Sequence, residues 1–169
     1  MHPKRVGKGF ISRLTPKANT QRQTEIRNNI RKEGRGLSGS GDGWTLLHYF
    51  SDQGHILAVQ LLLEKGADIE GDSKGAGTAL NCAAMRGHAD VVRILLDQGA
   101  EMNTRDLFGR TPLIQASRWG HENVVEALLE HGADFGAGDD EGKTAWDRAM
   151  ECEWGSGVRS LLEGAMSRR

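Results

Sequence analysis

Apolar residues in this chain form short stripes that are spaced for one face of a helix. The clearest stripe is Val91, Val92, Leu95 and Leu96, at positions i, i+1, i+4 and i+5, which predicts a helix with one buried face. The stripe returns at a constant 33-residue step, as Val59, Val92, Val125 and Val158 and as Leu62, Leu95, Leu128 and Leu161. The pattern therefore predicts similar helices that stack side by side, because one unit cannot bury its own stripe.

Polar residues and glycines follow the same 33-residue step. The recurring positions are Thr45, Thr78, Thr111 and Thr144; Gly54, Gly87 and Gly120; His55, His88 and His121; and Gly66, Gly99 and Gly132. A threonine before an apolar run predicts a helix N-cap, and Pro112 then stands at N1 in the third unit. A glycine after the run predicts a left-handed helix end. Each unit should therefore contain two short helices separated by a turn.

A 33-residue unit with T-P-L-H-x-A, then G-H, then V-V-x-x-L-L-x-x-G-A-D resembles the ankyrin repeat. The matching residues include Thr111-Pro112-Leu113-Ile114 and Gly66-Ala67-Asp68. The resemblance covers about residues 40–165. It implies an all-α fold, an ankyrin α-solenoid in which short β-hairpin turns connect helix–turn–helix units, and it implies partner binding on the concave side.

The repeat pattern divides the chain into seven segments. We expect a basic disordered arm at 1–20 and a degenerate N-terminal capping half-repeat at 21–40, because Ile26 and Ile30 stand one repeat length before Val59 and Leu63. Repeats follow at 41–74, 75–107 and 108–140. A C-terminal capping repeat at 141–165 departs from the pattern, as terminal repeats do, and residues 166–169 form a tail.

The net charge of −1 conceals two oppositely charged parts. Residues 1–41 contain ten Lys and Arg and two acids, whereas residues 42–169 contain twelve Lys and Arg and twenty-one acids. The basic arm fits a solvated tail, a nuclear-import or acid-contacting segment, or a mitochondrial presequence. We find no signal-peptide core and no apolar run of membrane-spanning length. Two cysteines indicate a reducing compartment, and we expect the cytoplasm, the nucleus or both.

The candidate chemical groups favour structural roles. Equivalent histidines in adjacent repeats should lie about 8–10 Å apart, too far to share a zinc ion, so we expect His55, His88 and His121 to hold their turns by hydrogen bonding. Cys82 and Cys152 lack a metal-binding spacing. None of the motifs G-x-x-x-x-G-K-[ST], H-E-x-x-H and G-x-S-x-G is present. We predict no enzyme, no catalytic residue, no cofactor and no metal.

Two polar features of the hairpins have an ordinary and a specific interpretation. Asp139, Asp140 and Glu141 form an acidic run, which we interpret as a solvated hairpin tip. Asn103 resembles the site of asparaginyl hydroxylation in ankyrin repeats, and the alternative is an ordinary hairpin asparagine.

The third repeat carries the strongest candidate for a binding site. Phe108, Arg110, Arg118 and Trp119 fall at positions that the fold does not determine, and Trp and Arg are enriched at binding hot spots. An exposed apolar cluster also carries an aggregation risk. We predict an interface centred on these four residues, with Met85, Arg86 and Trp44 beside it. The alternative is that Phe108 and Trp119 cover neighbouring repeats; the arginine stems could also lie over the rings.

Three functions are compatible with these residues. The leading hypothesis is a non-catalytic protein-interaction module, acting as an adaptor, scaffold or inhibitor, whose partner is another protein. A nuclear regulator is the second, with a basic arm that contacts nucleic acid or the import machinery, and an accessory subunit of an enzyme complex is the third. We expect a monomer and no membrane contact, and we do not expect a nucleic acid or a small molecule as the main partner.

Overall fold

The computed structural model of this 169-residue chain describes residue 24 and residues 43–73, 75–153 and 155–168. The predicted arm at 1–20 lies outside the described residues. So does the predicted capping half-repeat at 21–40, apart from Thr24.

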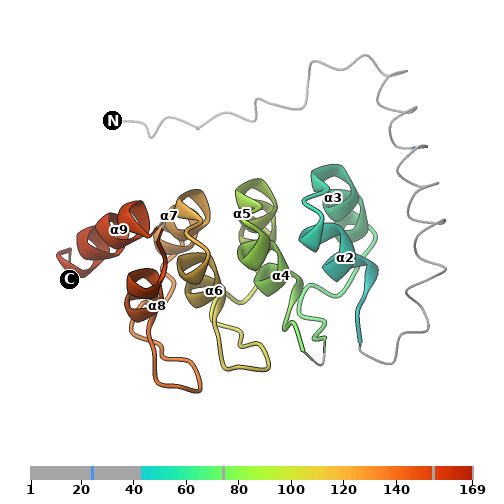
Figure 1. Cartoon of the computed structure of the whole chain (residues 1–169). Coiled ribbons are helices and arrows are strands. Elements are labelled where there is room, and N and C mark those ends of the chain that lie inside the picture. The colour runs from blue at the N-terminus through green and yellow to red at the C-terminus, as the bar shows by residue number, and fades with distance from the viewer. Residues whose placement is uncertain (1–23, 25–42, 74, 154, 169) are drawn as a thin grey trace, which may run out of the picture.

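The described residues form eight helices, arranged as four successive pairs (Figure 1). Their bounds are α2 (Leu46–Asp52), α3 (Ile56–Glu64), α4 (Ala79–Arg86), α5 (Ala89–Asp97), α6 (Pro112–Arg118), α7 (Glu122–Glu130), α8 (Ala145–Glu151) and α9 (Ser156–Met166). The first helices of the pairs (α2, α4, α6 and α8), here called inner helices, pack against one another in order. The second helices, here called outer helices, do the same. The predicted all-α solenoid is confirmed.

Local capping determines where each inner helix begins. Thr45, Thr78, Thr111 and Thr144 are the N-caps, and Pro112 stands at the start of α6. In three repeats the residue three positions later returns a hydrogen bond to the N-cap backbone N–H. These residues are His48, Asn81 and Asp147. The reciprocal bonds satisfy N–H groups that a helix start otherwise leaves unpaired.

The turn between the two helices of a repeat also joins that repeat to the preceding one. His121 Nε2 lies 3.0 Å from the carbonyl oxygen of Met85, and His88 Nε2 lies 2.8 Å from that of Asp52. The expected hydrogen-bonding role is thus confirmed for both, and each bond reaches one repeat back. Gly87 has φ of +82°, and a Cβ on it would lie 2.7 Å from His121 Nδ1, so glycine is needed both for its backbone and for the space.

The core lies between the two rows of helices. Val92, Leu95, Val125 and Leu128 on the outer helices are fully buried. Small side chains such as Ala83, Ala84 and Ala116 are also fully buried on the inner helices, where they let neighbouring helices approach. One continuous cluster of buried apolar residues extends from Leu47 to Leu162, as expected when each stripe is buried by the neighbouring repeat.

The hairpin tips lie side by side below the inner helices (Figure 1). In the structure each tip leads into the helix pair that follows it, so the tip with Asp106 and Leu107 belongs to the third repeat (α6 and α7) and the tip with Asp139 to the fourth (α8 and α9). The backbone N–H of Asp140 donates to the carbonyl of Phe108 at 3.1 Å, and that of Leu107 donates to the carbonyl of Gly75 at 3.3 Å. These bonds connect the tips of consecutive repeats and hold them in fixed positions. Side chains on the tips therefore belong to an ordered surface.

Candidate protein-binding surface

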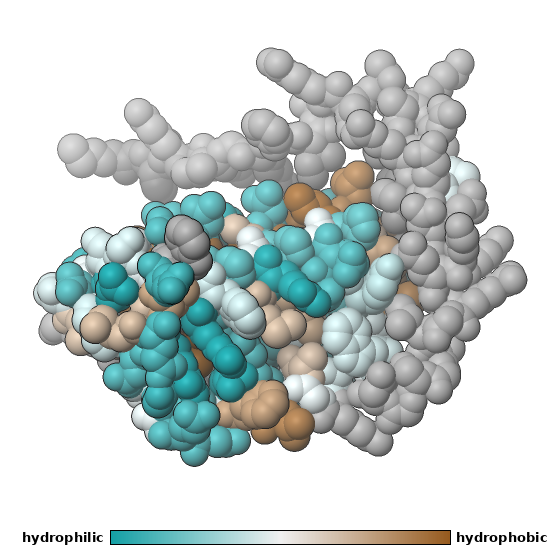
Figure 2. All heavy atoms as spheres, viewed as in Figure 1, coloured by the Kyte–Doolittle hydropathy of each residue, from teal (hydrophilic) through white to brown (hydrophobic). Residues whose placement is uncertain are grey.

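Large apolar residues are exposed on the third repeat. Leu107 and Phe108 in its hairpin tip are 66% and 53% exposed, and Trp119, the C-cap of α6, is 54% exposed. Figure 2 shows apolar atoms at the lower edge of the molecule, where the hairpin tips project. The seven residues of α6 span about 10 Å at 1.5 Å per residue, so Phe108 and Trp119 lie at opposite ends of an elongated surface. Because more than half of each is exposed, the neighbouring repeats do not bury these rings.

An arginine lies over each of the two aromatic rings, the arrangement that the sequence left open. The Arg110 Cζ atom is 4.5 Å from the centroid of the Phe108 ring, and the Arg118 Cζ atom is 5.6 Å from that of Trp119. Neither guanidinium forms an ion pair with a carboxylate of the described chain. Arg110 Nε is also hidden from solvent and has no hydrogen-bond partner among the described atoms. We call Phe108, Arg110, Arg118 and Trp119 the third-repeat surface.

The hairpin that carries Phe108 is held by its own polar residues. Asp106 Oδ1 accepts hydrogen bonds from the backbone N–H groups of Phe108 and Arg110, at 2.8 and 2.9 Å. Asp106 Oδ2 accepts from Gln115 Nε2 at 2.5 Å. The guanidinium of Arg105 donates to the carbonyls of Gly109 and Gly138, at 3.0 and 2.9 Å, and so ties the third tip to the fourth. These bonds pre-organise the Phe108 ring and reduce the entropy that binding would cost.

The other three predicted site residues are engaged elsewhere in the stack. Arg86 Nε donates to Asp52 Oδ1 at 2.7 Å, an ion pair with the first repeat, and this hydrogen bond raises the pKa of Arg86. Met85 is half-buried. Trp44 is also half-buried, with its ring centroid 5.9 Å from that of His48. The structure thus forms Phe108–Arg110 and Arg118–Trp119 as two ring–guanidinium pairs, with Trp44, Met85 and Arg86 outside those pairs.

The fourth repeat holds a buried charge cluster that the sequence analysis missed. Arg148 Nη2 lies 2.6 Å from Asp139 Oδ2, and the two side chains are 7% and 1% exposed. The same guanidinium pairs with Glu141 at 3.2 Å and with Glu151 at 3.0 Å, and Lys143 also pairs with Glu151. The interpretation of Asp139 as a solvated residue is therefore wrong. Its side chain is buried, and Arg148 compensates the charge. Aligning the repeats could have indicated that Asp139 and Arg148 pair. They stand one repeat length after Asp106 and Gln115, so the two residues of each pair have the same spacing.

Opposing effects act on the pKa of Asp139. Burial of its carboxyl group raises the pKa, because a charge is costly away from water. Hydrogen bonds from Arg148 and from the backbone N–H groups of Lys143 and Glu141 outweigh burial and hold the pKa below its ordinary value. Asp139 is therefore a charged structural group of the fourth hairpin.

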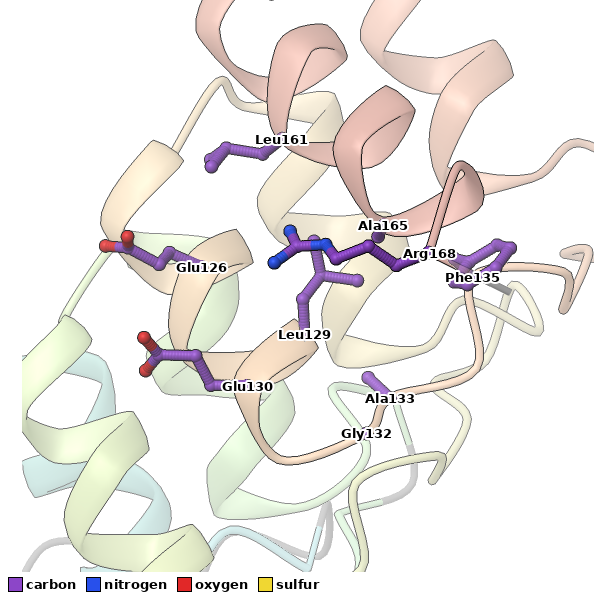
Figure 3. A pocket seen from close by; sticks show the side chains of 9 residues that line it. All are labelled: Glu126, Leu129, Glu130, Gly132, Ala133, Phe135, Leu161, Ala165 and Arg168. Carbon is purple, nitrogen blue, oxygen red and sulfur yellow. The ribbon is translucent and has the colours of Figure 1, made fainter.

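A groove of about 370 Å³ lies between the last two outer helices, α7 and α9 (Figure 3). Leu129, Phe135 and Leu161 supply apolar lining, with Glu126 and Glu130 along one side. Arg168 extends from the end of α9 across the groove in Figure 3. The groove is thus on the outer helices, whereas the third-repeat surface follows an inner helix and its hairpin.

The remaining candidate groups have structural partners or are buried. Among the described residues, no three His, Cys, Asp or Glu side chains gather in a way that could hold a metal ion. Burial raises the pKa of the Cys82 thiol to about 12, which keeps it protonated. Asn103 Oδ1 accepts a hydrogen bond from the backbone N–H of Asp134 at 3.1 Å, which links consecutive repeats.

Stacked helix pairs joined by lateral hairpin tips define the class of helical-repeat solenoid proteins. A family model described as ankyrin repeats (3 copies) matches residues 17–106 and 98–167, and the chain belongs to this family. No curated protein matches the sequence. Ankyrin repeats are generally protein–protein interaction modules. Within the described part of the chain, no helix has both the length and the apolar character that crossing a membrane requires.

Proposed function

We propose that this chain is a non-catalytic binding module, acting as an adaptor, scaffold or inhibitor, that holds a partner protein on its third-repeat surface. One observation carries the proposal: two exposed aromatic residues each lie under an arginine that has no carboxylate partner in the described chain. In this proposal Met85 and Arg86 of the second repeat and Trp44 of the first would extend the interface beyond its centre. Trp and Arg are the residue types that most often carry binding energy in interfaces.

The two pairs favour a partner with apolar anchors and carboxylates. A cation–π pair at an exposed site contributes about 0.5–1 kcal/mol. Hydrogen bonds between an arginine and a carboxylate are about twice as strong as neutral ones, so a partner's carboxylate can engage each guanidinium while apolar groups cover the rings. Because α6, about 10 Å long, lies between the two pairs along the chain, a bound segment that contacts both would extend along this helix.

Trp119→Ala tests the proposal when it is compared with Met150→Ala. Met150 is 59% exposed and lies on α8, outside the third-repeat surface, so it provides an equally exposed apolar control. Proteins retained by the tagged wild-type chain in native extract should be lost with Trp119→Ala and kept with Met150→Ala. The identified partner, once purified, should then bind Trp119→Ala about 30-fold more weakly, the roughly 2 kcal/mol of a hot spot.

Thermal unfolding of the three proteins controls for stability. Because Trp119 is half exposed, its truncation should leave the unfolding temperature near that of Met150→Ala. Equal partner affinity for Trp119→Ala and Met150→Ala, measured by calorimetry, would exclude this ring as the centre of the interface.

A further inference from the structure

The first outer helix, α3, carries apolar side chains where the later outer helices carry polar or small ones. Ile56 and Leu57 are 36% and 48% exposed. The residues at their positions, one and two repeat lengths along the chain, are Ala89 with Asp90 and Glu122 with Asn123. A helix that is apolar on more than one face is normally covered on more than one side.

Leu61 marks the uncovered side of α3. At the equivalent positions Ile94 packs against the core and Ala127 is fully buried, whereas Leu61 is only partly buried and stands apart from the core. Helices α5 and α7 each have an outer helix before them, but the described neighbours of α3 are α2 and α5. We call Ile56, Leu57 and Leu61 the α3 face. Figure 2 shows apolar atoms at the upper edge of the molecule, over α3.

We propose that residues 24–33 of the same chain cover the α3 face. The described stack begins at Gly43, so the preceding 42 residues join the protein at this end. The ankyrin family model starts its match at residue 17, well before α2. Ile26 and Ile30 stand one repeat length before Val59 and Leu63, which places them in register with an outer helix. This intramolecular contact involves none of the residues of the third-repeat surface and is independent of the proposed function.

Thermal unfolding of the full-length chain tests this contact through a double-mutant cycle. Leu57→Asn, which copies Asn123 of the third repeat, should lower Tm by about 3–6 °C, and Ile30→Asn should lower it by a similar amount. The double variant should lose less than the two separate shifts together, because both remove one contact. Leu107→Asn is the matched control: Leu107 is 66% exposed on a hairpin tip, and its replacement should change Tm by about 1 °C or less.

Cross-linking then identifies the occupant. In the full-length chain with Cys152→Ser, where the remaining Cys82 is buried, a short bismaleimide should join Ile30→Cys to Leu57→Cys within one molecule. It should not join Ile30→Cys to Leu107→Cys. Covalent dimers in place of the internal link would assign the α3 face to a second copy and overturn the proposal. Equal Tm values for Leu57→Asn and Leu107→Asn would also overturn it.

Discussion

The third and fourth repeats have the same backbone arrangement, but their charged residues have different partners. In both, an aspartate holds the hairpin tip, Asp106 in the third and Asp139 in the fourth, by accepting hydrogen bonds from backbone N–H groups. Asp106 meets the neutral Gln115, whereas Asp139 meets Arg148, a charged residue that is almost fully buried. The same scaffold position thus carries a hydrogen bond in one repeat and an ion pair in the next.

The other cationic side chains of the two repeats also differ in their partners. Arg148 binds three carboxylates of the fourth repeat, and Lys143 binds one of them. In the third repeat, Arg110 and Arg118 lie over aromatic rings. Arg148 and Lys143 of the fourth repeat are therefore neutralised by carboxylates of the same repeat, whereas Arg110 and Arg118 of the third have no carboxylate partner in the described chain. Charge content alone does not show which arginines are neutralised within a repeat, whereas the pairing does.

Breaking the Asp139–Arg148 pair should have the largest effect. Arg148→Met leaves the carboxylate of Asp139 buried without its cation, and loss of one partner from a buried pair costs about 3–5 kcal/mol of unfolding free energy. Gln115→Met at the equivalent position of the third repeat removes one hydrogen bond and should cost about 1–2 kcal/mol. Urea unfolding measures both. Equal losses would show that the two hairpins are held alike and that the ion pair adds nothing to the hydrogen bond.

Phe108→Ala should weaken binding of the purified partner by roughly 2 kcal/mol, about 30-fold. Because Phe108 and Trp119 lie at opposite ends of α6, the losses from Phe108→Ala and Trp119→Ala should add within about 0.5 kcal/mol. Met166→Ala, which removes an exposed side chain at the end of α9, should leave affinity unchanged. Calorimetric titration compares the wild type, the two single variants, the Phe108→Ala/Trp119→Ala double variant and Met166→Ala, and strongly non-additive losses in the double variant would indicate one compact anchor in place of two.

Acid should weaken the fourth repeat through Asp139. Its pKa in the folded chain lies below the ordinary value of 3.8, so the unfolded chain takes up this proton first as the pH falls. The stabilisation is present above about pH 4 and is lost as the pH drops through the folded pKa. Asp139→Asn should therefore lose less stability than the wild type between about pH 5 and pH 3, in urea unfolding at each pH. Parallel decreases in the two proteins would contradict the lowered pKa.

Most of the fold could be predicted from residue spacing, because the physics involved is local. A threonine caps a helix through its own backbone neighbours, as Thr111 does, and Gly87 adopts a positive φ that other residues avoid. The constant repeat length then predicts the stack. The exposure of two aromatic residues was also predictable, since Phe108 and Trp119 occupy positions that the repeat does not need for packing.

The pairing of charges was decided by tertiary structure. Arg86 meets Asp52 of the preceding repeat, and Arg148 meets Asp139 of its own hairpin. Arg110 and Arg118 lie over rings and pair with no carboxylate among the residues that the structure describes. The sequence by itself determined the repeating helices, through short-range capping and a regular apolar spacing. Which arginine is neutralised and which stays available depends on distances between separate segments and on burial, and these exist only once the repeats are stacked.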